Sequence, residues 1–549
     1  MKQPATYSVL IRCSLVRIVR IVLALASVIA LALSGRSASP AHAATFQVDD
    51  DGVQCPSALY TTIQAAIDAA APGDTIEVCA GTYNENVSIN KVLTLEGAGS
   101  DADPATNTII SGSGSGIGLS VVDGTDATTR VLVQDVRVTG FLHGLEVGSF
   151  TTLANVASTG NADRGLELRP LQDLLIQNSR FNGNAIGLRV ATTADVDNVE
   201  ITGSQFNDNS LHGWFIAKSS NAGDTSDVSN VTVSNTTFNN NLQKGLYAEK
   251  LSDALFDNIT VDNSGTDPTY GFNNGIDINL KYQPYQNITI QNASITNSGA
   301  YGTAPSNLFP AAVTIKARDD APSYNSDPAT LDGVTLTNVT IGGPENALRF
   351  GEAGKSNVGP TNVVVFHSSL LAGNSHGDTG FGLIDETQAQ PIAEENWWST
   401  AVPDFVALAS GDADTDPWCI NVACTTTVSA NPDGSIVVPP DATTSDIQQL
   451  LDDAPPGTVF HLPGGSFQGG LTVSSEGITL NLNGTTFGPG SPAFTINAAD
   501  VTIQGPGTLD GDPTNSGTNS GSPAILVTGG GDNFTLRDVE VKRWADGVQ

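Results

Sequence analysis

The chain has 549 residues, and its 57 acidic residues outnumber its 23 lysines and arginines, so its formal net charge at pH 7 is −34. A surface this negative repels the phosphate backbone of nucleic acids, and we therefore expect no nucleic-acid partner. Glycine is abundant, with 57 residues, and turn residues separate short runs of β-branched residues. This composition predicts many short strands and few helices.

Residues 1–43 are predicted to form a secretion signal. A basic start is followed by an apolar run at residues 21–33, which is too short to span a bilayer, and then by Ala41-His42-Ala43. The Ala-x-Ala pattern predicts cleavage after Ala43, and hence a secreted or cell-surface protein whose mature chain has no membrane span. Cleavage removes five of the 23 cations and none of the 57 acidic residues, which leaves 18 cations.

Four cysteines remain after this cleavage, and we expect all of them to form disulfides. An even number of cysteines in an exported protein favours disulfides, and the sequence has no Cys-x-x-Cys motif or Cys/His cluster that would bind a metal. Of the three possible pairings, proximity in the sequence favours Cys55–Cys79 near the start and Cys419–Cys424 further on.

A short amphipathic helix is predicted at residues 62–71, directly before the first strands. Ile63 and Ile67 fall on one face of this helix, and Pro72-Gly73 ends it. We expect the helix to cap the first coil of the fold, because the open end of a stack of strands exposes unpaired backbone groups.

One pattern recurs along the middle of the chain: an alternating apolar strand, an asparagine-rich turn, and then a glycine followed by a second apolar strand. The glycines at positions 165, 187, 213, 245 and 275 lie 22, 26, 32 and 30 residues apart. A period this variable predicts a solenoid of strands, whose turns can lengthen without disturbing the stacking. We interpret the asparagines as a structural ladder and the recurring phenylalanines as core, namely Phe181, Phe206 and Phe238.

The two ends of this repeat region resemble a known superfamily. The helix at 62–71 with the segment 73–99 is similar to the N-terminal cap and first coils of the pectate-lyase-like superfamily, and the Trp-rich segment 395–418 is similar to its closing segments. The resemblance covers residues 45–425 and implies an all-β, right-handed parallel β-helix. It implies no single activity, because the superfamily contains lyases, hydrolases, esterases, epimerases and non-catalytic surface proteins.

A second copy of the opening follows. Residues 446–457 align with 62–73, and several later positions keep the same offset of 384 residues. We therefore predict two β-helices in tandem: a first over 44–425, a proline-containing linker over 426–440, and the start of a second, incomplete one over 441–549.

Long insertions in the repeat carry the candidate catalytic residues. The segment 271–277 resembles the Asn-x-Asp-Gly-x-Asp motif of polygalacturonases, with Asp319 and Asp320 as a pair of acids one coil later and His376 before a glycine. The resemblance implies an inverting hydrolysis in which Asp277 and one of the paired acids lie roughly 6.5–9.5 Å apart. The first acid of the motif is replaced by asparagine, and the family's Arg-x-Lys motif is missing.

Two acidic runs are candidate Ca²⁺ ligands, and we expect no other cofactor. Asp412, Asp414 and Asp416 have the alternating spacing of a calcium loop, although Pro417 stands where such a loop needs glycine. The run at 49–51 has the alternative interpretation of a solvated turn.

Two functions fit these features. The first is a non-catalytic, adhesive or glycan-binding arm at the cell surface, and the alternative is a pectate-lyase-like or polygalacturonase-like enzyme. In both cases the expected partner is an extracellular polysaccharide. Aromatic residues near the insertions favour a sugar-binding groove, because such grooves use exposed rings as platforms; these residues are Tyr270, Phe272, Tyr282, Tyr285 and Tyr301.

Overall fold

The computed structural model describes residues 43–549 apart from 303–309, 353–356, 374–379, 388, 491 and 518–519. It forms two compact units, Met1–Thr45 and Phe46–Gln549, and only the second is described below. The predicted signal lies outside the described residues, apart from Ala43. Within the described part of the chain, no helix is long and apolar enough to cross a membrane.

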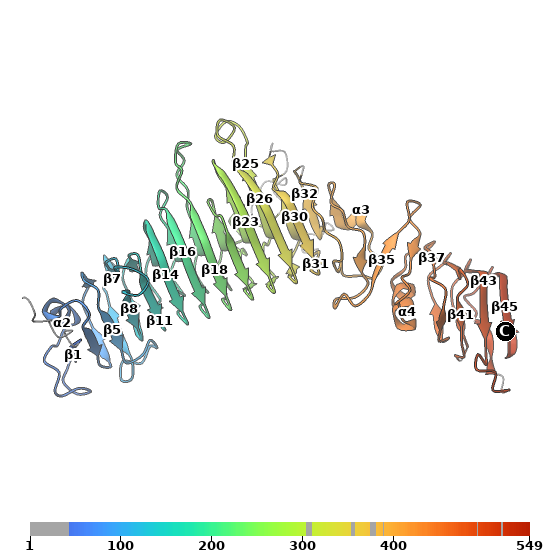
Figure 1. The fold of residues 1–549 in the computed structure, drawn as a ribbon, viewed down its shortest axis with the longest axis horizontal. Coiled ribbons are helices and arrows are strands. Elements are labelled where there is room, and N and C mark those ends of the chain that lie inside the picture. The colour runs from blue at the N-terminus through green and yellow to red at the C-terminus, as the bar shows by residue number, and fades with distance from the viewer. Residues whose placement is uncertain are drawn as a thin grey trace, which may run out of the picture. The chain divides into compact units, whose positions relative to one another are not determined.

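The second unit is built from parallel sheets to which each successive coil adds one strand (Figure 1). Pairing between strands distant in sequence confirms the predicted all-β, parallel β-helix solenoid. The first sheet contains twelve strands, in spatial order β1 (Thr45–Val48), β2 (Thr75–Val78), β5 (Thr94–Gly97), β8 (Val131–Gln134), β11 (Thr151–Ala154), β14 (Leu171–Gln177), β16 (Val196–Thr202), β18 (Val228–Ser234), β20 (Ala254–Asp257), β23 (Pro284–Gln291), β26 (Thr330–Thr337) and β30 (Thr361–Phe366).

A thirteen-stranded sheet forms the second face of the coil and carries the candidate site. Twelve of its strands follow one another in space, and β29 (Asn357–Val358) pairs with β25 from outside this order. The twelve are β4 (Val87–Ile89), β7 (Ile117–Val121), β10 (His143–Val147), β13 (Arg164–Leu168), β15 (Ile186–Val190), β17 (His212–Ile216), β19 (Lys244–Ala248), β22 (Asn274–Leu280), β25 (Ala311–Arg318), β28 (Asn346–Phe350), β32 (Leu383–Asp385) and β33 (Ala409–Ser410).

Short strands form the third face. They make two four-stranded sheets, and single bridges through Arg180, Gln205 and Thr237 connect one sheet to the other. The strands are β3 (Gly81–Tyr83), β6 (Thr108–Ser111), β9 (Val136–Thr139) and β12 (Ala157–Ser158), and then β21 (Thr260–Asp262), β24 (Ser294–Thr296), β27 (Thr340–Gly342) and β31 (Ser369–Leu371).

From Trp418 onward the strands belong to two further sheets. The first contains β34 (Trp418–Cys419), β35 (Thr427–Ala430), β36 (Ile436–Val437), β37 (Val459–His461), β38 (Ser466–Phe467), β40 (Thr479–Asn481), β41 (Thr486–Phe487), β43 (Thr502–Asp510) and β45 (Thr535–Lys542). The second contains β39 (Leu471–Val473), β42 (Phe494–Ile496), β44 (Ser520–Val527) and β46 (Trp544–Val548). The segment predicted as a linker contains β35 and β36, which pair antiparallel, and β36 then pairs parallel with β37.

The interior of the coil is filled by columns of like residues from successive coils. The rings of Phe181, Phe206 and Phe238 are all 0% exposed and stack with centroids 5.1 and 5.3 Å apart. A buried column of asparagines runs beside them, in which Asn209 Nδ2 donates to Asn241 Oδ1 at 2.9 Å. The structure thus confirms both the phenylalanine core and the structural role of the repeated asparagines.

Close contact between coils explains the repeated glycine. A Cβ atom at Gly187 would lie 2.5 Å from the carbonyl oxygen of Gly213, and one at Gly213 would lie 2.5 Å from that of Gly245. Real Cβ atoms do not approach this closely, so this position, the second residue of β15 and of β17, excludes larger residues. The spacing of the glycines therefore marks the spacing of the coils.

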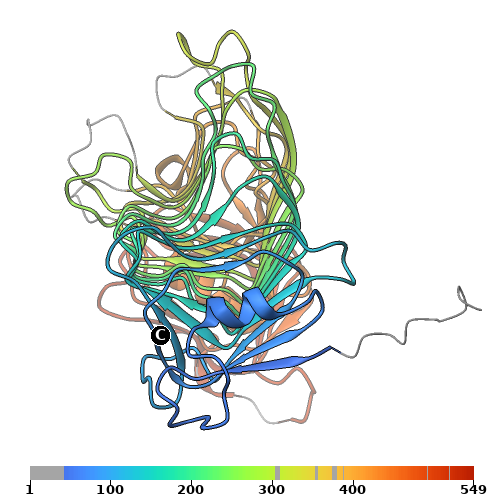
Figure 2. The same cartoon turned by 90° about the vertical axis from the view of Figure 1, so that its left-hand side faces the viewer.

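The first coil is capped as predicted. Helix α2 (Ile63–Ala69) lies across the end of the coil stack in Figure 2 and buries Ile63 and Ile67. The carboxylate of Glu85 accepts hydrogen bonds from the backbone N–H groups of Ile63 and Gln64, two of the donors that a helix start leaves unpaired. A second helix, α4 (Thr444–Asp453), has a capping box at Thr443 and precedes the parallel strands of the later sheets.

Both predicted disulfides are present. Cys55 is bonded to Cys79 next to the first coil, and Cys419 is bonded to Cys424. The Trp-rich segment packs nearby: the ring of Phe405, in the single-turn helix α3 (Phe405–Leu408), contacts Trp398 and Trp418 edge to face.

Candidate functional site

A cleft of about 340 Å³ lies on the outer face of the thirteen-stranded sheet, over β19, β22 and β25. The register of the sheet places Tyr247, Asp277, Thr314 and Arg349 in one column on successive coils. The cleft is lined by Lys244, Tyr247, Tyr270, Phe272, Asp277, Asn279, Lys281, Lys316, Arg318 and Glu352.

A buried ion pair forms part of the cleft floor. Lys244 Nζ donates to Asp277 Oδ2, and these side chains are only 3% and 2% exposed. Burial raises the pKa of Asp277, but the positive charges of Lys244, Lys316 and Arg349 outweigh burial and hold this pKa below its ordinary value. Asp277 is therefore an ionised carboxylate, although it is almost completely removed from water.

A second group of polar side chains continues the floor. Glu249 Oε1 pairs with Lys281 and accepts a hydrogen bond from Tyr247 Oη at 2.7 Å. Asn279 Nδ2 donates to the same phenol oxygen at 3.0 Å. Burial raises the pKa of Tyr247 well above its ordinary value, and the negative charge of Glu249 adds to this effect.

Two more ion pairs lie on the next coils. Lys316 Nζ donates to Glu352 Oε2 at 2.9 Å, and both side chains are 6% exposed. Arg318 donates two hydrogen bonds to Asp320, one of them to Oδ2 at 2.7 Å, and its guanidinium carbon lies 4.4 Å from the ring centroid of Tyr324. The cations of the cleft are therefore held in place by fixed partners.

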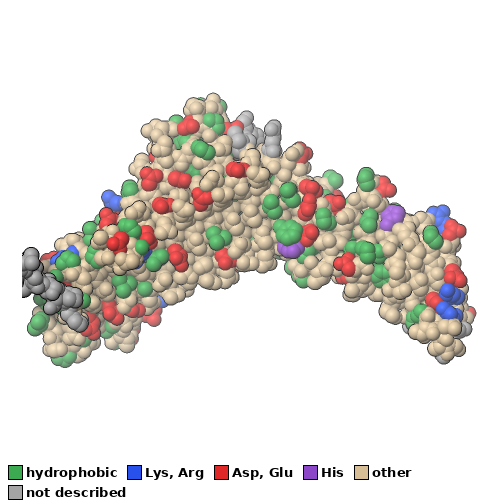
Figure 3. Space-filling model, viewed as in Figure 1, with side chains coloured by type: hydrophobic (Ala, Val, Ile, Leu, Met, Phe, Trp, Pro, Cys, Tyr) green, Lys and Arg blue, Asp and Glu red, His purple; other side chains and the backbone are tan. Residues whose placement is uncertain are grey.

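The balance of charge in the cleft differs from that of the chain as a whole. Four of the 18 cations that follow Ala43 line the cleft against two acids, namely Lys244, Lys281, Lys316 and Arg318 against Asp277 and Glu352. On the face drawn in Figure 3, by contrast, acidic side chains are spread along the surface and lysine and arginine are few.

Two aromatic rings form a wall of the cleft. Phe272 is 51% exposed, and its ring lies 5.8 Å from that of half-buried Tyr270 in an edge-to-face contact. The prediction that Tyr282 and Tyr285 offer exposed platforms is wrong. They are 2% and 3% exposed, and their hydroxyl groups donate to the backbone carbonyls of Ser220 and Lys281.

The structure separates the predicted catalytic acids. Asp277 is part of the cleft, whereas Asp320 is bound by Arg318 and does not line it. Asp319 is half-buried directly after β25 and is not among the lining residues either. His376 lies outside the described residues.

The candidate Ca²⁺ ligands are in two different settings. Asp412, Asp414 and Asp416 are exposed, and Asp416 Oδ1 accepts a hydrogen bond from the backbone N–H of Ala430 at 3.1 Å. Ca²⁺ binding by these three residues stays a prediction. The carboxylates of 49–51 accept hydrogen bonds from backbone N–H groups of Cys55, Thr82 and Val53, and Asp49 is 1% exposed, so this run is not simply solvated. Ca²⁺ binding by this run also stays a prediction.

Sequence reasoning missed most of the cleft. Lys244, Tyr247, Lys316 and Glu352 belong to no motif, and neither does Arg349, which lines the adjoining small pocket and is 4% exposed. A usable signal is present in the repeat itself. Counted from the repeated glycine at the start of each strand, Tyr247 and Asp277 occupy the same position and are therefore neighbours in the sheet.

We expect four tyrosines to keep their protons well above pH 10. Burial raises the pKa of Tyr83, Tyr247 and Tyr285 far above the ordinary 10.0, and that of Tyr270 to about 12. The unfolded chain releases these protons near pH 10, whereas the folded chain keeps them to a higher pH. Stability from these groups is therefore complete below pH 10 and is lost as the pH rises through the folded pKa values.

An alkaline titration followed by phenolate absorbance checks this expectation. The native protein is expected to titrate four fewer tyrosines than the guanidinium-unfolded protein below a pH of about 11. Equal titration of the two samples would show that these phenols are open to water.

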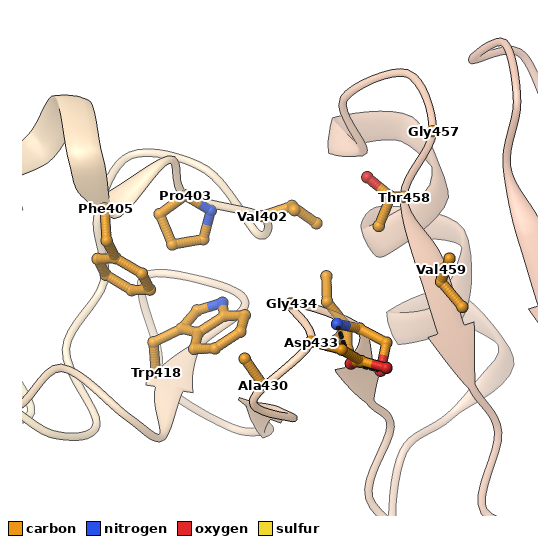
Figure 4. Close-up of a pocket in the computed structure, with 12 residues that line it drawn as sticks. Val402, Pro403, Phe405, Trp418, Ala430, Asp433, Gly434, Gly457, Thr458 and Val459 are labelled. Carbon is orange, nitrogen blue, oxygen red and sulfur yellow. Dashed lines mark hydrogen bonds between the residues drawn. The ribbon is translucent and has the colours of Figure 1, made fainter.

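A second cleft, of about 360 Å³, lies where the Trp-rich segment meets β36 and β37 (Figure 4). Phe405 and Trp418 form one side, and Gly457 to Val459 lie opposite. The indole N–H of Trp418 donates to the Ala401 carbonyl, and Asp433 accepts hydrogen bonds from Ser435. Among its lining residues only Asp433 is ionisable, so the cleft over β22 has the richer chemistry.

Comparison with known proteins shows similarity of fold only. No protein-family model and no curated protein matches the chain. Among solved structures, the chain is similar to the PL6-family alginate lyase AlyGC, at 14% identity and TM-score 0.37, over 87% of this chain and 74% of that one.

Two other solved structures show the same degree of likeness. The catalytic domain of a GH87 α-1,3-glucanase in complex with nigerose matches at 14% identity and TM-score 0.41, over 65% of this chain and 66% of that one. The tailspike gp49 of Acinetobacter baumannii bacteriophage Fri1 is a capsular polysaccharide depolymerase. It matches at 13% identity and TM-score 0.31, over 54% of this chain and 58% of that one. At identities this low the likeness is one of fold alone.

Proposed function

We propose that this is a secreted or cell-surface β-helix protein that binds an acidic extracellular polysaccharide in the cleft over β19, β22 and β25. The observation that carries the proposal is the gathering of four cations in one open cleft of a chain whose net charge is −34. The two disulfides support an oxidising compartment outside the cytoplasm.

The cleft offers the groups that an acidic sugar chain needs. An ammonium group has three donors and a guanidinium has five, so Lys281, Lys316 and Arg318 keep donors for sugar carboxylates and hydroxyls after their ion pairs are made. The exposed face of Phe272 is available to the apolar side of a sugar ring. Elsewhere the acidic surface repels a polyanion, which favours binding at the cleft.

Binding without cleavage fits the carboxylates better than hydrolysis does. An inverting hydrolysis requires one carboxyl group to be protonated, but the pKa of Asp277 is held below its ordinary value. Glu249 and Glu352 are each paired with a lysine, and Asp320 is bound by Arg318. The proposed role is therefore that of a glycan-binding arm.

Calorimetric titration of the chain without its predicted signal tests the proposal, with polygalacturonate and alginate as acidic ligands and dextran as a neutral one. We expect binding of an acidic polymer that weakens as salt rises, and no binding of dextran. The double variant Lys316→Ala/Arg318→Ala is expected to lose about tenfold in affinity, or roughly 1.4 kcal/mol.

The matched control is Arg169→Ala, which removes a 62% exposed arginine outside the cleft. It is expected to bind as the unmodified protein does. An absence of binding across both acidic polymers at low salt, or an equal loss in the Arg169 variant, would contradict the proposal. Release of reducing ends or absorbance at about 235 nm, abolished by Asp277→Ala, would instead favour the enzymatic alternative.

A further inference from the structure

A small pocket of about 20 Å³ adjoins the cleft. The loop that precedes β22 forms one side of it, and residues of β25 and β28 contribute to its lining. It shares Phe272, Asp277, Lys316 and Glu352 with the cleft, so the two spaces are adjacent. Its other lining residues are Gly271, Asn273, Asn274, Pro310 and Arg349.

Asn273 lines this pocket and has one unsatisfied side-chain oxygen. The side chain is 1% exposed, and its amide nitrogen donates to the backbone carbonyls of Asp267 and Ala300 at 2.7 and 3.1 Å. These two bonds fix the orientation of the amide, so the remaining atom is an acceptor. Among the described residues, Asn273 Oδ1 has no hydrogen-bond partner.

Asp277 presents a second such oxygen. Its Oδ2 accepts the hydrogen bond from Lys244, whereas its Oδ1 is buried and has no hydrogen-bond partner within the described part of the chain. Buried polar atoms in folded proteins are satisfied almost without exception by protein, water or ligand. Two unsatisfied acceptors on residues that line one pocket therefore point to a hydrogen-bond donor as its occupant.

Size and charge restrict what this donor can be. A water molecule needs about 10–15 Å³ of such space, so the pocket has room for one atom of that size. A metal ion is disfavoured, because the positive charges of Lys244, Lys316 and Arg349 already act on Asp277. A single hydroxyl group, or a water molecule in its place, fits both restrictions.

We propose that this pocket determines the specificity of the cleft by receiving one hydroxyl group of a bound sugar residue, which donates its proton to Asp277 Oδ1 or Asn273 Oδ1. This inference rests on the proposed function. Phe272 lies at both the pocket and the cleft, where its exposed ring can support the sugar whose hydroxyl is inserted.

Blocking the hydroxyls of the ligand tests the inference. Polygalacturonate and alginate are titrated before and after O-acetylation, which leaves their carboxylates unchanged. The unmodified protein is expected to bind the unacetylated polymer about tenfold tighter or more, because an acetylated hydroxyl can neither donate nor enter the pocket. Asn273→Ala is expected to reduce this ratio to about twofold, mainly through weaker binding of the unacetylated polymer.

Asn263→Ala is the matched control, because Asn263 belongs to an exposed asparagine column away from the cleft and donates to Asn240. This variant is expected to keep the full preference of the unmodified protein for the unacetylated polymer. Equal binding of both polymer forms by the unmodified protein, or a full ratio in folded Asn273→Ala, would overturn the inference. If Asn273→Ala does not fold, Asp277→Asn provides the same comparison. Failure of every unacetylated polymer to bind would refute the proposed function as well, whereas binding without hydroxyl discrimination would refute the pocket alone.

Discussion

Replacement of Asp277 by alanine is expected to destabilise the β-helix by about 3–5 kcal/mol, because it leaves the Lys244 ammonium group buried without its partner. The substitution also removes the negative charge that Lys316 and Arg349 face, since their charges act on Asp277 as well. In a unit of about 500 residues that unfolds together, 1 kcal/mol corresponds to roughly 1 °C. Scanning calorimetry is therefore expected to show a midpoint lower by about 3–5 °C.

The opposite change, Lys244→Met, is expected to reduce the stability of the fold less than Asp277→Ala does. Asp277 then still faces the positive charges of Lys316 and Arg349, so its carboxylate is not left alone. The double variant Lys244→Met/Asp277→Leu buries no uncompensated charge at this pair and is expected to be more stable than Asp277→Ala alone. Equal losses in the two single variants would contradict the asymmetry that we infer from the surrounding cations.

An exposed ion pair provides the control for this series. Arg169 lies 3.0 Å from Glu146 and is 62% exposed, so its removal is expected to cost less than about 1 kcal/mol. A loss in Arg169→Ala as large as that in Asp277→Ala would show that burial does not set the cost.

Truncation of Phe206 to alanine is expected to have an effect of similar size, about 3–5 kcal/mol. The ring is 0% exposed and stacks on Phe181 and Phe238 with interplanar angles of 10° and 13°. Its removal opens a cavity between coils that cannot close, because backbone pairing holds the spacing of the coils. Calorimetry of the variant measures the loss directly.

Phe215→Ala is the matched control for the core. Phe215 lies on a neighbouring strand, but its half-buried ring packs on Tyr247 outside the coil, so a smaller loss is expected. Phe206→Leu keeps much of the side-chain volume, so its loss of stability is expected to lie between those of Phe206→Ala and Phe215→Ala. A loss below about 1 kcal/mol for Phe206→Ala would mean that neighbouring coils fill the space.

The fold was predictable because its cause is local and repeated. The coils around Gly187, Gly213 and Gly245 each require a close-packed glycine, a buried asparagine and strands in which apolar and polar residues alternate. These residues therefore recur in the sequence once per coil. The capping helix and both disulfides also follow from neighbouring residues. The hairpin of β35 and β36 was not predicted, because its two strands are very short and prolines surround them.

The candidate site was only partly predictable. Asp277 was identified through a local motif, whereas its partner Lys244 lies 33 residues away on another coil and belongs to no motif. Asp319 and Asp320 are adjacent in sequence and still do not line the cleft with Asp277. Tyr282 and Tyr285 resembled exposed platforms because a turn composition does not reveal which side of the turn is buried.

The sequence by itself determined that this chain coils into stacked parallel strands. Each coil makes the same contacts with the next one, so the same residue types recur in the sequence once per coil. Only the tertiary structure decided which outward side chains meet, because Tyr270, Phe272 and Glu352 lie outside the strands and the repeat does not fix where such loop residues lie. The cleft with its four cations and the pocket at Asn273 and Asp277 combine such loop residues with residues of the strands.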